Sequence, residues 1–231
     1  MNQSRKDIQR IRMWQYFIDA ATEVIEEEGM ENVTIRKVAD LAGYTSSTAY
    51  NYFEDLSHMK FFAALRFIKP YTEDLPRYIE QGENTLEQWL YTWKCFLKHS
   101  FERPFIYQTI FLDDLGDASD EMLSRYYQIY PEDLISVPTE LQGLLKEESF
   151  SKRSENFIFA AAEEGFIDQR DLASLAEITH MIWVGALTLY INKRKPWTKE
   201  EAIDYVYTHV HKTVMTFVKP AFKDKINIHH L

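Results

Sequence analysis

Apolar residues recur along most of this chain at the three- and four-residue spacing of helices that bury one face. The first run covers residues 7–28, where seven apolar side chains share one side and Gly29 is suited to end the helix. A second run opens at Thr34 and ends at Gly43, and a third covers residues 45–53. The pattern therefore predicts three consecutive helices, of which the second and third are short.

The helical pattern continues through the rest of the sequence and predicts an all-α protein. A fourth helix is expected at residues 57–69, ended by Pro70, and no run alternates with the two-residue period of a β-strand. We place a domain boundary after residue 66, which gives an N-terminal three-helix head at 1–66 and a C-terminal helical domain at 67–231. The remaining expected helices cover residues 71–81, 85–102, 104–113, 119–129, 131–146, 151–164, 171–194 and 199–218.

The composition fits a soluble helical protein, because 45% of the 231 residues are hydrophobic and there are only seven glycines and seven prolines. The single cysteine, Cys95, excludes an internal disulfide and a cysteine-rich zinc module, and its apolar neighbours indicate a buried thiol. No apolar run approaches the ~18 residues of a membrane helix, and the N-terminus has no signal-peptide pattern. A cytoplasmic protein that binds no membrane is expected. No cofactor is expected, and no metal site either, because no histidine has a partner at ligand spacing.

A helical enzyme is a competing class, and the sequence gives it little support. It contains no Gly-x-Ser-x-Gly, no His-Glu-x-x-His and no glycine-rich phosphate loop. The acidic pairs Asp113-Asp114 and Glu163-Glu164 are adjacent, so their carboxylates leave different faces of a helix instead of converging on one substrate. We therefore expect a protein without catalytic residues.

Charge is unevenly distributed in the head. Residues 1–60 carry seven Lys and Arg against ten Asp and Glu, a net charge of −3, within a whole-chain charge of −10. Any basic surface must therefore be local. Arg5, Lys6, Arg10 and Arg12 form such a cluster before and at the start of the first helix.

The second and third helices meet in a pattern typical of a helix-turn-helix. Small Ala39 allows close helix approach, three residues follow, and Gly43 supplies the turn. Arg36 and Lys37 lie in the first turn of the second helix, where the helix dipole disfavours cations unless an anion such as phosphate lies nearby. In such a unit the second helix of the motif enters the major groove of DNA, although the Ala-x-x-x-Gly spacing alone is common in helical proteins.

Four ordered motifs lie between Trp14 and Phe62. They are Glu27-Glu28-Gly29, Val33-Thr34-Ile35, Val38-Ala39-Asp40-Leu41-Ala42-Gly43 and Thr48-Ala49-Tyr50-Asn51-Tyr52-Phe53. Over this stretch the chain resembles the TetR family of regulators. The resemblance implies a transcription regulator, expected here to be a repressor, with a head that binds double-stranded operator DNA. It also implies a C-terminal domain that binds an effector and forms a homodimer.

Three positions depart from the family pattern. Ser47 stands where glycine is common, Ala49 replaces a larger apolar residue, and Asp55-Leu56 replaces a segment that usually carries lysine. The lost lysine removes an expected contact to the DNA backbone, and Lys60, one turn further, is expected to replace it. With the acidic head, this keeps an alternative open: a helical ligand-binding or interaction protein with a degenerate DNA-binding head.

The side chains expected at DNA are those that face outward from the second and third helices. The Arg36 guanidinium matches a guanine edge or a phosphate, and the Asn51 amide matches an adenine edge. Hydroxyl groups bind phosphates and position the protein, although Thr34 and Thr45 are also suited to cap helices. The expected DNA-binding residues are Thr34, Arg36, Thr45, Ser46, Ser47, Thr48, Tyr50, Asn51, Tyr52 and Lys60.

Two features are expected in the C-terminal domain. The resemblance implies that the last two long helices form the dimer, and both carry apolar faces that a four-helix bundle would cover. The expected interface residues are Leu175, Ile182, Trp183, Leu187, Tyr205, His209 and Phe217.

Aromatic residues of the central helices are candidates for a pocket that binds an unidentified apolar or aromatic small molecule, although core packing is the common role of such residues. The pocket candidates are Trp89, Trp93, Phe96, His99, Phe105, Tyr107, Phe111, Tyr126, Tyr127 and Phe157.

Overall fold

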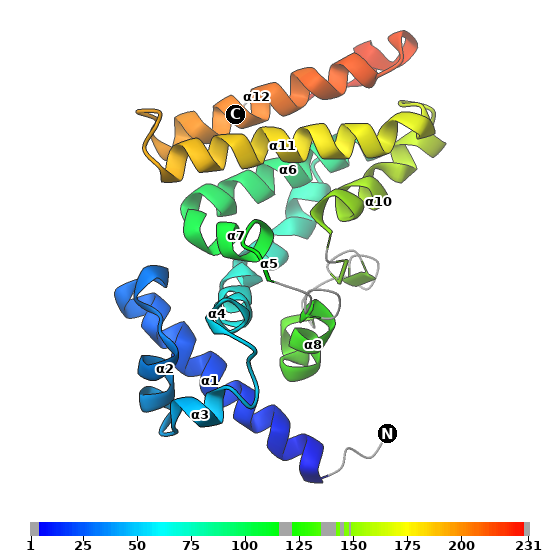
Figure 1. The fold of residues 1–231 in the computed structure, drawn as a ribbon. Helices are drawn as coiled ribbons and strands as arrows, with labels where there is room; N and C mark the ends of the chain where they lie inside the picture. Colours follow the sequence, from blue (N-terminus) through cyan, green and yellow to red (C-terminus); the bar gives the residue numbers. More distant parts are fainter. Residues whose placement is uncertain (1–4, 116–121, 135–141, 144–145, 148, 229–231) are drawn as a thin grey trace. The chain divides into compact units, whose positions relative to one another are not determined.

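The computed structural model describes residues 5–115, 122–134, 142–143, 146–147 and 149–228. All regular elements in these ranges are helices, which confirms the predicted all-α class (Figure 1). The chain divides into two compact units, one formed by Met1–Lys69 with Phe105–Asp133 and the other by Pro70–Pro104 with Leu134–Leu231. This division differs from a single boundary after residue 66, because the segment around residues 105–133 packs with the N-terminal helices.

The first unit is built on the long helix α1 (Arg5–Glu28). α2 (Ile35–Ala42) and α4 (Leu56–Leu65) pack against α1, and α3 (Ser46–Ala49) packs against α2. A short 3₁₀ turn, η1 (Met30–Asn32), joins α1 to α2. The core of this unit is aromatic. The Trp14 ring lies 4.5 Å from the ring of Phe53 and 4.7 Å from that of Phe62, measured between centroids.

The two short helices begin and end at the residues that the sequence predicts. Thr34 caps α2 by accepting a hydrogen bond from the Lys37 amide at 3.2 Å. Gly43 ends α2 in the left-handed conformation, with φ of 79°, which glycine adopts without steric cost. α3 is shorter than the predicted 45–53, because its regular part ends at Ala49 and residues 50–52 continue as turns.

Among the described residues, the first unit also contains α7 (Pro104–Phe111), α8 (Met122–Ile129) and the 3₁₀ turn η4 (Pro131–Leu134). α8 packs against both α1 and α4. α7 and α8 fall within the helices predicted at 104–113 and 119–129. Most of the helix predicted at 131–146 lies outside the described residues, and its described start forms the turn η4.

The chain passes from α4 through η2 (Arg66–Ile68) into α5 (Lys69–Ile79), which opens the second unit. Pro70 was expected to end a helix, but it is the second residue of α5. A proline is tolerated there because the first amides of a helix have no intrahelical acceptor.

In the part of the second unit that the structure describes, α5 is joined by α6 (Thr85–Glu102), α10 (Phe150–Glu163), α11 (Leu172–Ile191) and α12 (Lys199–Phe217), with the 3₁₀ turns η5 (Gln169–Asp171) and η6 (Pro220–Lys225). α10 and α12 each pack against α6 and α11. Trp183 of α11 is fully buried, and its indole N–H donates to the Ser100 hydroxyl of α6 at 3.1 Å. Cys95 is buried as predicted, and burial raises the pKa of its thiol to about 12.

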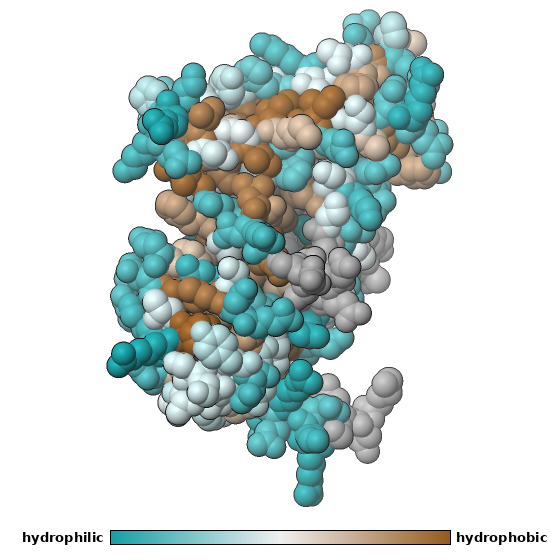
Figure 2. All heavy atoms as spheres, viewed as in Figure 1, coloured by the Kyte–Doolittle hydropathy of each residue, from teal (hydrophilic) through white to brown (hydrophobic). Residues whose placement is uncertain are grey.

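α11 is apolar on nearly every side, although polar residues interrupt its apolar sequence. By length and composition alone the helix Gln169–Ile191 could cross a membrane, and 39% of its most apolar window is buried within the chain. Ile178, Met181 and Leu189 of α11 are exposed, and Figure 2 shows hydrophobic residues gathered over this helix. One side of α11 therefore belongs to the core, while another apolar side faces outward.

Candidate DNA-binding surface and ligand pocket

The outer face of α2 and α3 carries polar side chains that do not pack into the core. The Arg36 side chain is 89% exposed, and its Nε lies 3.9 Å from the exposed Asp40 carboxylate, a pair of little energetic consequence. Tyr50 is 57% exposed, and Asn51 is also exposed. These residues are available to an external partner.

Basic residues of α1 lie beside the end of this recognition segment. Lys6, Arg10, Asn51 and Tyr52 line one groove, together with Asp7. The sequence marked the basic cluster at the start of α1 but gave no reason to place it next to Asn51. The fold therefore puts cations that can bind phosphate beside an amide that can bind a base edge.

Several predicted hydroxyl groups have a structural role as well. Thr45 caps α3 by accepting from the Thr48 amide at 3.2 Å, and the two threonine hydroxyl oxygens are 3.0 Å apart. Tyr52 is half-buried, with its ring centroid 6.0 Å from that of Phe17. Ser46 is half-buried and Ser47 is exposed. These residues shape the segment whether or not DNA is bound.

The structure does not bring Lys60 to this surface. Lys60 is half-buried and lines a different groove, which also contains Glu31 and Asp113. At the start of α4, where the family usually carries lysine, Asp55 caps the helix by accepting from the His58 amide at 2.8 Å. The expected replacement for the lost lysine is therefore not found beside the recognition segment.

Arg125 is a cation that lies near the head, although the sequence gives no indication of this. Arg125 of α8 lines a groove with Arg10 and Trp14 of α1, and its guanidinium carbon lies 5.8 Å from the centre of the Trp14 ring. The contact arises because α8 packs against α1, and no periodic pattern connects two segments this far apart.

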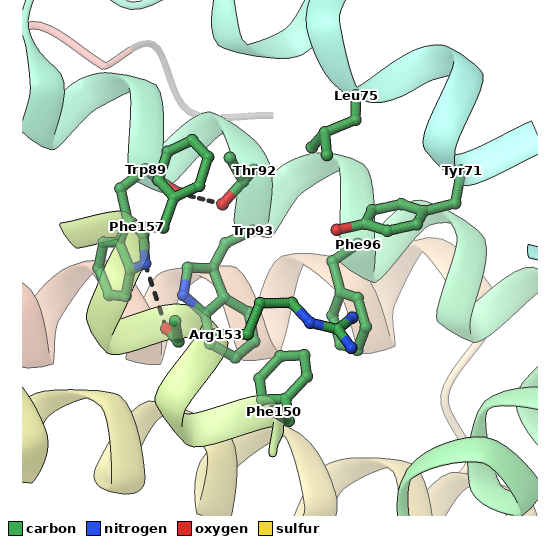
Figure 3. Close-up of a pocket in the computed structure, with 10 residues that line it drawn as sticks. Tyr71, Leu75, Trp89, Thr92, Trp93, Phe96, Phe150, Arg153 and Phe157 are labelled. Atoms are coloured by element: carbon green, nitrogen blue, oxygen red, sulfur yellow. Dashed lines mark hydrogen bonds between the residues drawn. The ribbon is translucent and has the colours of Figure 1, made fainter. Parts of the chain in front are cut away.

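A second candidate site is an aromatic pocket enclosed by α5, α6 and α10 of the second unit. About 510 Å³ of empty space lies within it, including its open mouth, and about 50 Å³ of this can hold the centre of a water molecule. The indole N–H of Trp89, which lines the pocket, donates a hydrogen bond to the Ser154 hydroxyl at 3.2 Å (Figure 3). The lining residues are Tyr71, Leu75, Trp89, Thr92, Trp93, Phe96, Phe150, Arg153, Ser154 and Phe157.

Four of the ten pocket candidates line this pocket, namely Trp89, Trp93, Phe96 and Phe157. His99 does not, because its Nε2 pairs with the Asp74 carboxylate at 3.0 Å. The other five candidates belong to the first unit, because the segment that carries them packs with α1 and α4. They are Phe105, Tyr107, Phe111, Tyr126 and Tyr127.

The predicted dimer residues fall into two groups. Leu175, Trp183 and Leu187 have no exposed surface even in the single chain, so they are core residues and cannot meet a second copy. Tyr205 is 42% exposed, whereas Ile182, His209 and Phe217 are half-buried. Periodicity could not distinguish the two sides of α11, since both are apolar.

This combination of an all-helical chain and an N-terminal helix-turn-helix defines a class of DNA-binding regulators. Residues 17–55 match the family described as bacterial regulatory proteins, tetR family. The resemblance to the TetR family is therefore confirmed for this segment, and the fold is that of TetR-family transcription regulators. No curated protein matches the chain by sequence.

Solved structures share the fold across both units. RolR in complex with its ligand resorcinol has a TM-score of 0.59 and 15% identity, over 94% of this chain and 93% of that chain. FadR of Thermus thermophilus, a TetR family transcriptional repressor in complex with lauroyl-CoA, has a TM-score of 0.58 and 11% identity, over 87% and 93%. The fatty acid degradation regulator FadR of Bacillus halodurans has a TM-score of 0.50 and 15% identity, over 91% and 96%. At these identities the likeness establishes the fold alone.

Proposed function

We propose that this chain is a one-component transcriptional repressor. It binds operator DNA as a homodimer and leaves the operator when a small molecule occupies the pocket between α5, α6 and α10. The observation that carries the proposal is the groove in which Lys6 and Arg10 lie beside Asn51. Cations for the phosphate backbone and an amide for a base edge are the two kinds of group that a sequence-specific DNA-binding surface needs.

The outward residues divide into two roles. Asn51 and Arg36 are exposed, and their planar polar groups can each make two hydrogen bonds to a base edge. Tyr50, Lys6 and Arg10 bind phosphates and set the orientation of the recognition segment. Because the head is acidic outside this surface, each cation in it contributes a large share of the affinity.

The exposed apolar side of α11 supports the homodimer. Ile178, Met181 and Leu189 lie on this side, and they would be hidden if α11 and α12 met the same helices of a second copy. A twofold dimer presents two recognition segments and therefore fits a palindromic operator. A regulator of this kind acts in the cytoplasm and needs no catalytic residue.

The pocket supports a small-molecule effector. Two solved structures of the same fold hold ligands, resorcinol in RolR and lauroyl-CoA in FadR of Thermus thermophilus. These molecules differ greatly in size and polarity. The ligand of this chain is therefore inferred from its own aromatic pocket and not from theirs. Binding releases the operator if the ligand favours a conformation of the dimer with a different spacing of the two heads.

Selection of bound duplexes from a random pool tests the function directly. The purified protein is expected to enrich a palindrome with two half-sites, and the affinity for it should fall steeply with salt. A protein with Asn51→Ala serves as the matched control and should lose the enrichment at one base pair of each half-site. If the wild-type protein enriches nothing and binds no duplex at low salt, the chain is a helical ligand-binding protein with a degenerate head.

A further inference from the structure

A second groove adjoins the groove that contains Asn51. It lies between α1 and α8, and its lining residues include Arg10 and Arg125. Asp7 and Arg10 line both grooves, so the two grooves share a wall on α1. Both grooves belong to the same compact unit of the chain. A partner that contacts Arg10 in one groove is therefore close to the other groove as well.

The charge of the two grooves is opposite to that of the head as a whole. Among the described residues that line them, three are cationic and one carries a carboxylate. The cations are Lys6, Arg10 and Arg125, and the carboxylate is that of Asp7. Residues 1–60 have a net charge of −3, and the whole chain has one of −10. A local cationic surface on an acidic protein attracts a polyanion, and duplex DNA is the polyanion that the adjacent recognition segment would bind.

α8 presents Arg125 on its exposed side, whereas the opposite side of the helix is buried. Two hydrogen bonds fix this part of the chain on α1. The Gln15 side-chain amide donates to the backbone carbonyl of Ile129 at 3.2 Å. Just after α8, the Tyr130 hydroxyl donates to the Asp19 carboxylate at 2.8 Å. The place of Arg125 beside α1 is therefore defined by contacts other than its own.

The Arg125 side chain has the chemistry of a phosphate contact. Its guanidinium carbon lies 5.8 Å from the centre of the Trp14 ring, a cation–π contact that orients the group without hydrogen bonds. The planar guanidinium matches two oxygens of one phosphate. Gln128, which is exposed and one turn further along α8, lines the same groove and offers an amide donor. The exposed side of α8 therefore carries two side chains that can bind a phosphate group.

From these observations we infer that Arg125 of α8 binds a phosphate of the operator backbone, close to the phosphate that Arg10 binds. The helix-turn-helix and α1 are then only part of the DNA-binding surface, because a helix far along the chain extends it. Arg125 adds affinity without a preference for any base pair. The inference rests on the proposed function, since it requires that the groove of Asn51 meets duplex DNA.

The test measures the affinity of the full-length protein for the duplex selected from the random pool, by fluorescence anisotropy across a salt series. Arg125→Gln should reduce the slope of log affinity against log salt by about 1 per subunit, on selected and scrambled duplexes alike. Arg125→Lys, which keeps the charge, should retain the slope. Arg170→Gln is the matched control, because it removes an exposed arginine from the other unit and should leave the slope unchanged.

A variant that adds charge tests the same groove in the opposite direction. Gln128→Lys places a further cation beside Arg125, and it should make the salt dependence steeper by about 1 per subunit if this groove lies along the DNA backbone. This variant retains Arg125 and its contact with Trp14. It therefore tests the groove even if Arg125→Gln destabilises the head, which urea unfolding of each variant shows.

A second readout identifies the phosphate. Uncharged methylphosphonate groups replace the phosphates of the selected duplex one at a time. One replacement in each half-site should weaken binding of the wild-type protein roughly 10-fold, as expected for the loss of a hydrogen bond to a charged group, and should have no further effect on Arg125→Gln. The same replacement should still weaken binding by Arg10→Ala. A purely structural role of Arg125 would not couple it to one phosphate.

The inference is overturned if Arg125→Gln keeps the wild-type slope, if Gln128→Lys leaves the slope unchanged, or if no phosphate is coupled to Arg125. Failure of the proposed function gives a different result. The wild-type protein then binds no duplex at low salt, and both proposals fall together. If Arg10→Ala reduces the slope and Arg125→Gln does not, the DNA-binding function stands and only the contact from α8 is wrong.

Discussion

The guanidinium of Arg66 donates to the carboxylate of Asp133 at 2.7 Å, although the two residues are 67 positions apart in the chain. The Tyr126 hydroxyl donates to the same carboxylate oxygen at 2.5 Å, and the Asp133 side chain is 7% exposed. Nearby, the Tyr130 hydroxyl donates to Asp19 of α1 at 2.8 Å. These contacts attach α8 and η4 to the helices of the head.

Replacement of Asp133 should therefore destabilise the first unit. Asp133→Ala leaves the Tyr126 hydroxyl and part of the Arg66 guanidinium buried without their acceptor, which should lower the free energy of unfolding by about 1–3 kcal/mol. Urea unfolding followed by circular dichroism measures the change. Asp168→Ala, which removes exposed ion pairs with Lys219 and Arg170, is the control and should change stability by less than about 1 kcal/mol. Equal effects of the two variants would show that the buried network adds nothing.

Most helices of this fold could be predicted from the sequence, because their apolar residues recur on one face and their ends carry caps. α6 spans the predicted range without change, and Thr34, Gly43 and Thr45 act at helix ends as predicted. The return of residues 105–133 to the head could not be predicted. It depends on contacts such as that of Arg66 with Asp133, which no local pattern reveals.

The candidate sites were predicted less completely, for two physical reasons. A helix that is apolar on all sides gives no indication of which side meets the core, and Trp183 was consequently assigned to the wrong side of α11. Aromatic residues also look alike in sequence whether they line a pocket or fill a core, so Tyr126 was grouped with Trp93.

The exposed side of α11 should hold the dimer together. Met181 is 68% exposed, and Met181→Glu should place a charge in the interface and produce monomers with a folded core. Phe105→Glu, which alters an exposed apolar residue of α7, should leave the dimer intact. Light scattering and sedimentation measure the mass of each variant. A dimer that persists in Met181→Glu at low concentration would mean that copies associate through another surface.

Two kinds of DNA contact should be separable by mutation. Asn51→Ala should cost about 1–3 kcal/mol on the selected duplex and relax its preference at one base pair. Arg10→Ala should weaken selected and scrambled duplexes alike and reduce the slope of log affinity against log salt by about 1 per subunit. Lys60→Ala is the matched control, because Lys60 lies in the groove with Glu31 and Asp113 and should leave the slope unchanged. A reduced slope in Lys60→Ala and a normal one in Arg10→Ala would reverse the assignment.

The C-terminal segment should depend on one buried carboxylate. Glu87 is 1% exposed, and its carboxylate accepts hydrogen bonds from the amides of Asn227 at 2.7 Å and Glu83 at 2.9 Å. Glu87→Ala should release the segment after η6, so that the Asn227 amide exchanges its hydrogen much faster. Hydrogen exchange measured by mass spectrometry reports this, with the exposed Glu200→Ala as the control. Unchanged protection at Asn227 would show that other contacts hold the segment.

A buried histidine should make the stability of the head depend on pH. His58 is 3% exposed among the rings of Trp14, Phe53 and Phe62, and its Nδ1 accepts a hydrogen bond from the Glu54 amide at 3.1 Å. Burial lowers the pKa of His58 below its usual 6.5, and nearby Arg125 lowers it further, while the carboxylates of Glu54 and Asp55 act in the opposite direction. The folded head therefore favours neutral His58.

The direction of the pH effect follows from this shift. Above the unfolded pKa of about 6.5, His58 is neutral in both states and its full contribution to stability is present. As the pH falls from 6.5 toward the lower folded pKa, His58 is protonated in the unfolded chain but stays neutral in the folded head, so the free energy of unfolding decreases.

In His58→Asn the side-chain amide oxygen can still accept a hydrogen bond from the Glu54 amide, but the side chain does not titrate. This part of the decrease in the free energy of unfolding should therefore disappear. Urea unfolding between pH 7.5 and pH 5 measures it, with His209→Asn of α12 as the control, which should keep the wild-type slope. Parallel stability curves for wild type and His58→Asn would show that another group causes the pH dependence.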